Sequence, residues 1–145
     1  MKFFGKTAAL GAAAGLALLA IACGKDNTTS TTPTQTPAAP TITERYVATI
    51  NVGGSGFYSF SVSQYGTVNV TLNVVSGADD PTVQLGLGLG QPSGFGCNAP
   101  TTITAAAGTD PQLTGAYAIG VYCARVYDVG NLTGPATFDV TIAHP

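Results

Sequence analysis

From Thr41 onward, apolar residues recur at every second position, and this period of two constrains the fold more than any other feature of the sequence. In the clearest run, residues 67–74, Thr or Asn alternates with Val or Leu. A second run, residues 83–90, alternates Val or Leu with Gln or Gly. No window has helical spacing. About seven such strands, separated by Gly, Pro and Asp turns, predict an all-β, antiparallel β-sandwich.

The same alternation predicts the burial of individual side chains. If the first run keeps its period to the end, Val74 is buried. A later run, residues 117–123, is expected to form one strand. On that strand Cys123 would face the core together with Ile119 and Val121.

The first 22 residues have the pattern of a signal peptide. Lys2 and Lys6 give a positive start, and Thr7 to Ala22 is uncharged and rich in Ala, Gly and Leu. This stretch is shorter than the roughly 20 apolar residues that span a bilayer comfortably. We therefore expect residues 1–22 to be cleaved after export, with an uncleaved anchor as the alternative.

The segment Leu19 to Cys23, LAIAC, resembles the lipobox of bacterial lipoproteins. In that family the Cys receives a diacylglyceryl group, the chain is cut just before it, and the new amine is acylated with a fatty acid such as palmitate. The resemblance implies a lipid anchor on Cys23, and Gly24 fits the family's route to the outer membrane. The family prefers Leu where Ala20 stands, so ordinary secretion stays open.

Residues 23–40 follow as a Thr- and Pro-rich segment, GKDNTTSTTPTQTPAAP after the Cys. It has no apolar side chain larger than Pro, so it can bury little. Its prolines favour polyproline II. We expect a disordered tether between the anchor and a domain spanning residues 41–145, with glycan attachment to its Thr residues as an alternative.

Charge excludes one class of partner. The chain beyond Cys23 carries all seven acidic residues but only three basic ones, Lys25, Arg45 and Arg125. Nucleic-acid binding needs a cluster of basic side chains to neutralise phosphates. We therefore expect no nucleic-acid partner.

Three segments of the domain resemble the bacterial pre-peptidase C-terminal domains. They are GFYSFSV at 56–62, GAYAIGV at 115–121 and FDVTI at 138–142. The resemblance implies a jelly-roll-like β-sandwich of the kind appended to secreted enzymes. That family often carries acidic residues before its central strand, where Asp79 and Asp80 stand here, although residues 81–84 lack its further acidic residue.

Cys97 and Cys123 remain once Cys23 is assigned to the lipid. An exported chain meets an oxidising compartment, so we expect the two to form a disulfide. Two Cys and one His do not make a tetrahedral metal site. No cofactor is expected, apart from a weak calcium candidate at Asp79 and Asp80, where a solvated turn is the alternative.

Catalytic groups are scarce in the domain. His144, its one histidine, stands next to the end of the sequence, where we expect fraying. No Lys follows Lys25, and the adjacent acids Asp79 and Asp80 point apart and cannot flank one bond. The sequence thus indicates no enzyme.

Tyr122, Arg125 and Tyr127 are the candidate binding patch, because exposed aromatic side chains beside an Arg suit ligand contacts. Cross-strand packing of the same residues is the alternative. The sequence therefore predicts an exported, lipid-anchored binding module of the cell envelope, with a protein or polysaccharide partner. A structural subunit of an envelope assembly is the second hypothesis, and a hydrolase accessory or enzyme the third.

Overall fold

The computed structural model describes residues 34–77 and 82–145. The predicted signal peptide, Cys23, most of the tether and the calcium candidates Asp79 and Asp80 lie outside these residues. In the part of the chain that is described, no helix is long and apolar enough to cross a membrane.

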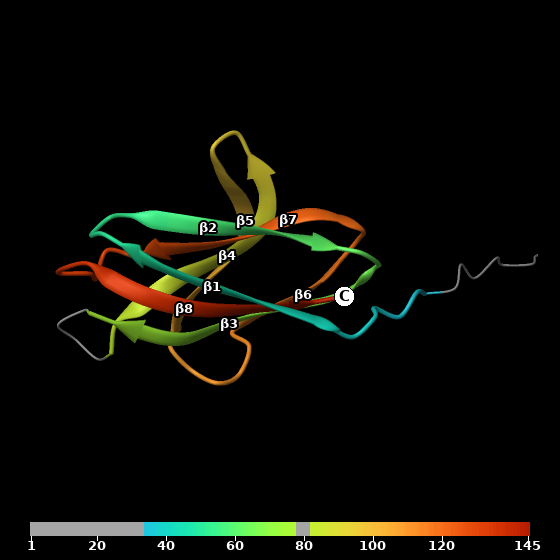
Figure 1. Ribbon diagram of the computed structural model, residues 1–145, viewed down its shortest axis with the longest axis horizontal. Coiled ribbons are helices and arrows are strands. Elements are labelled where there is room, and N and C mark those ends of the chain that lie inside the picture. Colours follow the sequence, from blue (N-terminus) through green and yellow to red (C-terminus); the bar gives the residue numbers. More distant parts are fainter. Residues whose placement is uncertain (1–33, 78–81) are drawn as a thin grey trace, which may run out of the picture. The chain divides into compact units, whose positions relative to one another are not determined.

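The described chain is an all-β sandwich, as the sequence predicts. Two four-stranded antiparallel sheets have the orders β1-β8-β3-β6 and β2-β7-β4-β5 (Figure 1). Eight strands in two such sheets are the arrangement of a jelly roll. The strands are β1 (Ile42–Ile50), β2 (Ser55–Val62), β3 (Gly66–Ser76), β4 (Gln84–Ser93), β5 (Gly96–Ala106), β6 (Leu113–Tyr117), β7 (Gly120–Asp128) and β8 (Ala136–His144).

The core lies between the sheets and is built from the alternating apolar positions. Leu85, Leu87 and Leu89 of β4 are buried, as predicted. Leu72 of β3 and Phe138 of β8, in the facing sheet, belong to the same buried cluster. One apolar face per strand is what two stacked sheets require, and it explains why the period of two predicts the fold.

The prediction that Val74 is buried is wrong. The pairing of β3 with β8 shifts between Leu72 and Val74, which places Asn73 as an extra residue in a β-bulge. Beyond the bulge the positions that face the core are shifted by one residue. Val74 is therefore exposed, and Val75 packs against the core. The amide of Asn73 donates a hydrogen bond to the Thr141 hydroxyl at 2.7 Å.

The predicted strand over residues 117–123 is also wrong. β6 ends at Tyr117, β7 begins at Gly120, and the two strands belong to different sheets. Ile119 lies in the crossing and is exposed, and Val121 is exposed on β7. Tyr122 faces the core, so Cys123, although buried, lies on the outer side of its sheet.

Residues 34–40 belong to the predicted tether, and their last part contacts the sandwich. The Ala38 amide donates to the Tyr65 carbonyl at 3.1 Å, and the Thr67 amide donates to the Ala38 carbonyl at 2.8 Å. Gly66 permits this contact, because a Cβ there would lie 2.6 Å from the Ala38 oxygen. The backbone therefore pairs with the domain before the predicted boundary at Thr41.

Candidate functional site

The ends of β4 and β5 form a hairpin that stands out from the sandwich (Figure 1). Ser93 pairs with Gly96 across a two-residue turn, Gly94-Phe95. Gly94 has a φ of 57°, which glycine adopts without strain. The Phe95 side chain at the tip is fully exposed. We call residues 91–98 the hairpin.

A β-bulge at Gly90 bends the hairpin away from the plane of its sheet. The pairing shifts from Leu89 with Thr101 to Gln91 with Asn98, so two residues of β5 oppose Gly90. A Cβ on Gly90 would lie 1.8 Å from the Asn98 carbonyl oxygen. Only glycine fits this close approach of two backbones.

The disulfide between Cys97 and Cys123 fixes the bent hairpin over β7. Its two Cα atoms are 5.9 Å apart, within the usual range for such a bond. This confirms the pairing that the sequence predicts. Because Cys123 lies on the outer side of the sheet, the bond holds the hairpin against that outer face.

The outer face of the β2-β7-β4-β5 sheet is a surface of small and aromatic residues. Gly86, Gly88 and Gly90 of β4 pair with Tyr127, Arg125 and Cys123 of β7. A Cβ on Gly86 would lie 2.2 Å from the Tyr127 ring, so the absence of a side chain lets that ring lie flat on β4. The Arg125 guanidinium sits 5.1 Å from the centre of the same ring, in a cation–π contact.

One hollow, of about 340 Å³, opens on this outer face beneath the hairpin. We call it the outer hollow. Its walls are Phe95, Gly96 and Cys97 of the hairpin, and its floor comes from β2 and Arg125. Phe57 of β2 is exposed at its rim. In the described residues Arg125 has no carboxylate partner, and its polar contact is the Ser55 hydroxyl at 3.5 Å.

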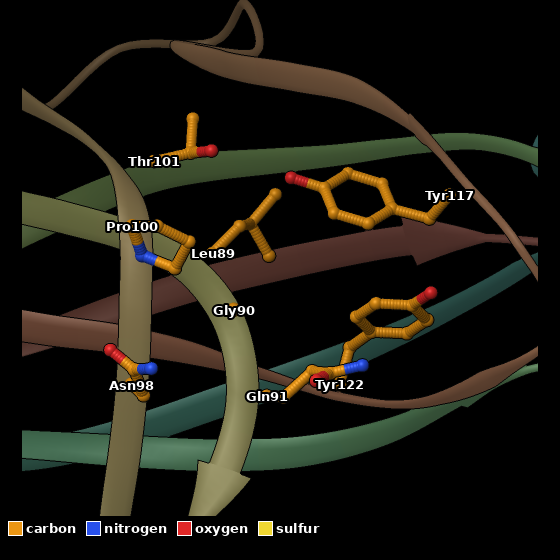
Figure 2. A pocket seen from close by; sticks show the side chains of 8 residues that line it. All are labelled: Leu89, Gly90, Gln91, Asn98, Pro100, Thr101, Tyr117 and Tyr122. Atoms are coloured by element: carbon orange, nitrogen blue, oxygen red, sulfur yellow. The ribbon is translucent and has the colours of Figure 1, made fainter.

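A second hollow, of about 230 Å³, lies on the other side of the hairpin (Figure 2). We call it the tyrosine pocket. The rings of Tyr117 and Tyr122 meet edge to face there, with centroids 5.0 Å apart. Burial raises the pKa of the Tyr117 hydroxyl, and a hydrogen bond from Thr101 partly offsets it. The lining residues are Leu89, Gly90, Gln91, Asn98, Pro100, Thr101, Tyr117 and Tyr122.

The structure divides the candidate patch of Tyr122, Arg125 and Tyr127 between these places. Arg125 and Tyr127 lie on the outer face, as predicted. Tyr122 faces inward, where its ring packs 6.2 Å from that of Phe60 and lines the tyrosine pocket. β7 runs unbroken to Asp128, so its period of two separates residue 122 from residues 125 and 127.

Sequence reasoning missed Phe95 and Phe57. Phe95 stands in the segment GFG at 94–96, between two glycines. A large aromatic residue inside a glycine turn has no neighbours on its own strand to pack against. That combination was the available signal for an exposed contact residue.

The expectation that His144 frays is wrong. His144 pairs with Ile42 in the β1–β8 ladder and is buried, with 2% of its surface exposed. Its Nε2 lies 3.0 Å from a carboxylate oxygen of Glu44, and the Tyr58 hydroxyl donates a hydrogen bond to the other oxygen. The Tyr58 bond, together with His144, holds the pKa of Glu44 below its usual value. The three side chains tie β1, β2 and β8 together.

No group of three or more metal-binding side chains occurs in the described ranges. Asp128, the last residue of β7, is bound to backbone amides. Its carboxylate accepts hydrogen bonds from the backbone amides of Gly53 at 2.7 Å and Gly130 at 2.8 Å, and from those of Asn131 and Leu132. These bonds lower the pKa of Asp128. Calcium binding at Asp79 and Asp80 stays a prediction.

Comparisons with known proteins identify no family for this chain. No protein-family model matches the chain, and no curated protein matches it. Among solved structures it is similar to the Aeromonas hydrophila protein PliG, a periplasmic lysozyme inhibitor of g-type lysozyme, with 15% identity. The match covers 74% of this chain and 93% of that chain, with a TM-score of 0.49. At this level of identity the likeness carries no function.

Proposed function

We propose that this protein is a lipid-anchored, non-enzymatic binding module of the cell envelope, and that its hairpin and outer hollow hold a protein partner. The anchor rests on the lipobox resemblance at Cys23, and export is supported by the Cys97–Cys123 disulfide. The one histidine of the domain is buried in a contact with Glu44, which supports a role other than catalysis.

The observation that carries the proposal is the exposure of Phe95 on a rigid support. Leaving a Phe side chain in water forgoes about 1.5–3 kcal/mol of burial energy. Phe95 is nonetheless held clear of the sandwich by a bulge at Gly90 and by the disulfide at Cys97. A fixed aromatic side chain beside a hollow is the usual form of a protein-binding anchor, because little conformational entropy is lost on binding.

The surroundings of Phe95 indicate the chemistry of the partner. Phe57 adds a second apolar contact across the outer hollow, and Arg125 adds a positive charge that no carboxylate of the described residues neutralises. A partner surface with an apolar cavity for Phe95 and an acidic side chain for Arg125 would satisfy both.

The test is crosslinking in intact cells followed by purification of the chain from solubilised envelope. The wild type is expected to retain a partner protein, and the variant Phe95→Ser to lose it. Val47→Ser is the matched control, because Val47 is also an exposed apolar residue but lies on the other sheet. Equal recovery from both variants would refute the hairpin as the contact. A crosslink between two copies of the chain would favour the structural-subunit hypothesis instead.

The anchor has a separate test. Metabolic labelling with a fatty-acid analogue is expected to mark the wild type, and Cys23→Ser is expected to lose both the label and membrane attachment. If the Ser variant stays with membranes after a high-salt wash, the lipid anchor is wrong, whereas the hairpin proposal still stands.

A further inference from the structure

The tyrosine pocket is separated from the outer hollow by the hairpin itself. Gln91 and Asn98 of the hairpin line the tyrosine pocket, whereas Phe95 and Cys97 line the outer hollow. A ligand in the tyrosine pocket therefore does not compete directly for Phe95. We propose that the tyrosine pocket binds one neutral sugar ring, such as a residue of an envelope glycan.

The floor and walls of the pocket are apolar and aromatic. Leu89 forms part of the floor, and Pro100 stands across from the two tyrosine rings (Figure 2). The planes of the rings of Tyr117 and Tyr122 meet at 72°, so the rings make a corner rather than a flat platform. A pyranose presents C–H groups on its faces, and these can pack against such a corner.

The rim of the pocket is polar but carries no charge. Gln91 and Asn98 are exposed, and within the described residues their side-chain amides have no hydrogen-bond partner. Each amide offers two donors and one acceptor oxygen. The hydroxyls of Thr101 and Tyr117 bond to each other and keep further capacity to donate and accept. Sugar hydroxyls also do both. None of the eight lining residues is ionisable as an acid or a base near neutral pH, which favours a neutral ring over an acidic one.

The size of the pocket sets the size of the ligand. Its volume of about 230 Å³ is below the range of roughly 300–1,000 Å³ that accommodates drug-sized ligands. One ring therefore fits, and the rest of a glycan would extend into solvent. A single ring in a pocket of this kind is expected to bind in the millimolar range.

The pocket is preorganised. Tyr122 packs against Phe60 in the core and against Tyr117, so its ring is already fixed. The disulfide holds the hairpin that supplies Gln91 and Asn98. Few rotamers are lost on binding, which favours weak but specific recognition of a small ring.

An apolar protein side chain is the competing occupant. It would contact Leu89 and the tyrosine rings equally well, but it would leave the amides of Gln91 and Asn98 unused at the rim. Two unpaired amides beside an aromatic corner match a ring that has both C–H faces and a perimeter of hydroxyls. This combination decides between the two occupants.

Tyrosine fluorescence gives a direct readout, because the chain contains no Trp and six Tyr. The full chain in a detergent without a sugar headgroup is titrated with maltose, cellobiose and diacetylchitobiose. Glucuronic acid and a proline-rich peptide are titrated in parallel. At least one neutral disaccharide is expected to change the fluorescence to saturation, and the acid and the peptide are expected to leave it unchanged.

The double substitution Gln91→Ala with Asn98→Ala tests whether the sugar binds at the polar rim of the tyrosine pocket. Both side chains are exposed, so the melting temperature is expected to stay the same while sugar affinity falls about tenfold or more. Tyr122→Ala should abolish binding, but it also removes packing against Phe60. Phe95→Ser is the control and is expected to bind sugar as the wild type does.

Three results would overturn the sugar site: no neutral disaccharide saturates, only the acid or the peptide does, or the folded double variant binds like the wild type. A protein partner lost with Phe95→Ser while sugar binding persists would support both sites independently. Loss of sugar binding in that control would instead show that the assigned pocket is wrong.

Discussion

The outer faces of the two sheets are built in different ways. On the β1-β8-β3-β6 sheet, polar side chains pair with one another across strands. Arg45 donates to the Asp139 carboxylate from Nε, at 3.0 Å to each oxygen, and from a terminal guanidinium nitrogen at 2.6 Å. The hydroxyls of Thr49 and Thr137 are 2.7 Å apart. On the β2-β7-β4-β5 sheet, glycines replace such pairs and a bent hairpin covers part of the face.

This difference indicates where binding is located. Cross-strand pairs satisfy their own polar groups and leave little for a partner. The glycine-rich face leaves Arg125 without a carboxylate partner in the described part of the chain, and it leaves Phe95 in solvent. Both sheets contain a β-bulge, but only the bulge at Gly90 bends a hairpin out of its sheet, and the unused contacts lie at that hairpin.

Among the changes that test this difference between the faces, reduction of the Cys97–Cys123 bond is expected to have the largest effect on stability. A loop of 26 residues stabilises the fold by roughly 3–4 kcal/mol in the chain-entropy model. Loss of that contribution should lower the melting temperature by more than about 10 °C. The measurement is thermal unfolding with and without reductant, monitored by circular dichroism. A shift of only a degree or two would show that the hairpin is held without the bond.

Substitution of Gly90 tests the bulge. Gly90→Ala brings a methyl group against the Asn98 carbonyl and should destabilise the fold by about 1–3 kcal/mol. Gly96→Ala is the matched control in the same hairpin, because the nearest atom to its Cβ would be 3.8 Å away. Urea titrations of both variants measure the difference. Equal midpoints would mean that the two backbones do not approach as closely as described.

Acid should act on the paired sheet and not on the hairpin, whose residues 91–98 carry no ionisable acid or base. The pKa of Glu44 is lowered, so its contribution to stability is present above the ordinary value of 4.5 and is lost as the pH falls below it. Glu44→Gln is expected to flatten the pH dependence of stability in this range by up to about 1 kcal/mol.

Asp110→Asn is the control for that experiment, because Asp110 is exposed and has no hydrogen-bond partner in the described residues. The melting temperatures of both variants are measured from pH 3 to pH 7, a range that includes the ordinary pKa of a carboxyl group, about 4. If both variants follow the wild-type profile, the Glu44 cluster does not contribute to acid stability.

The sandwich was predictable because most strands have a single apolar face. The alternation in residues 83–90 correctly predicts that the leucines of β4 are buried. The disulfide followed from the expectation of export and from the count of cysteines. Both predictions depend on composition and period, which do not require knowledge of which strands are neighbours.

The bulges and the hairpin were not predictable in the same way. The Val-Asn alternation continues through Asn73 without any sign of the extra residue, since a bulge depends on the partner strand β8. Residues 117–123 read as one run because Ala118 and Ile119 are apolar, although the chain changes sheets there. The tyrosine pocket likewise combines residues 89–101 of β4 and β5 with Tyr117 of β6 and Tyr122 of β7, and no sequence pattern indicates that these two segments meet.

The smallest effect on stability is expected from two arginine substitutions, one on the outer face of each sheet. Arg45→Ala removes an exposed ion pair with Asp139, and Arg125→Ala removes a cation–π contact with Tyr127. Each substitution is expected to change stability only slightly, because both charges are near water. Only Arg125→Ala is expected to weaken partner recovery, since only Arg125 lies at the outer hollow. The two variants carry the same change in net charge, so a loss of binding from both would point to overall electrostatic attraction and remove the distinction between the faces.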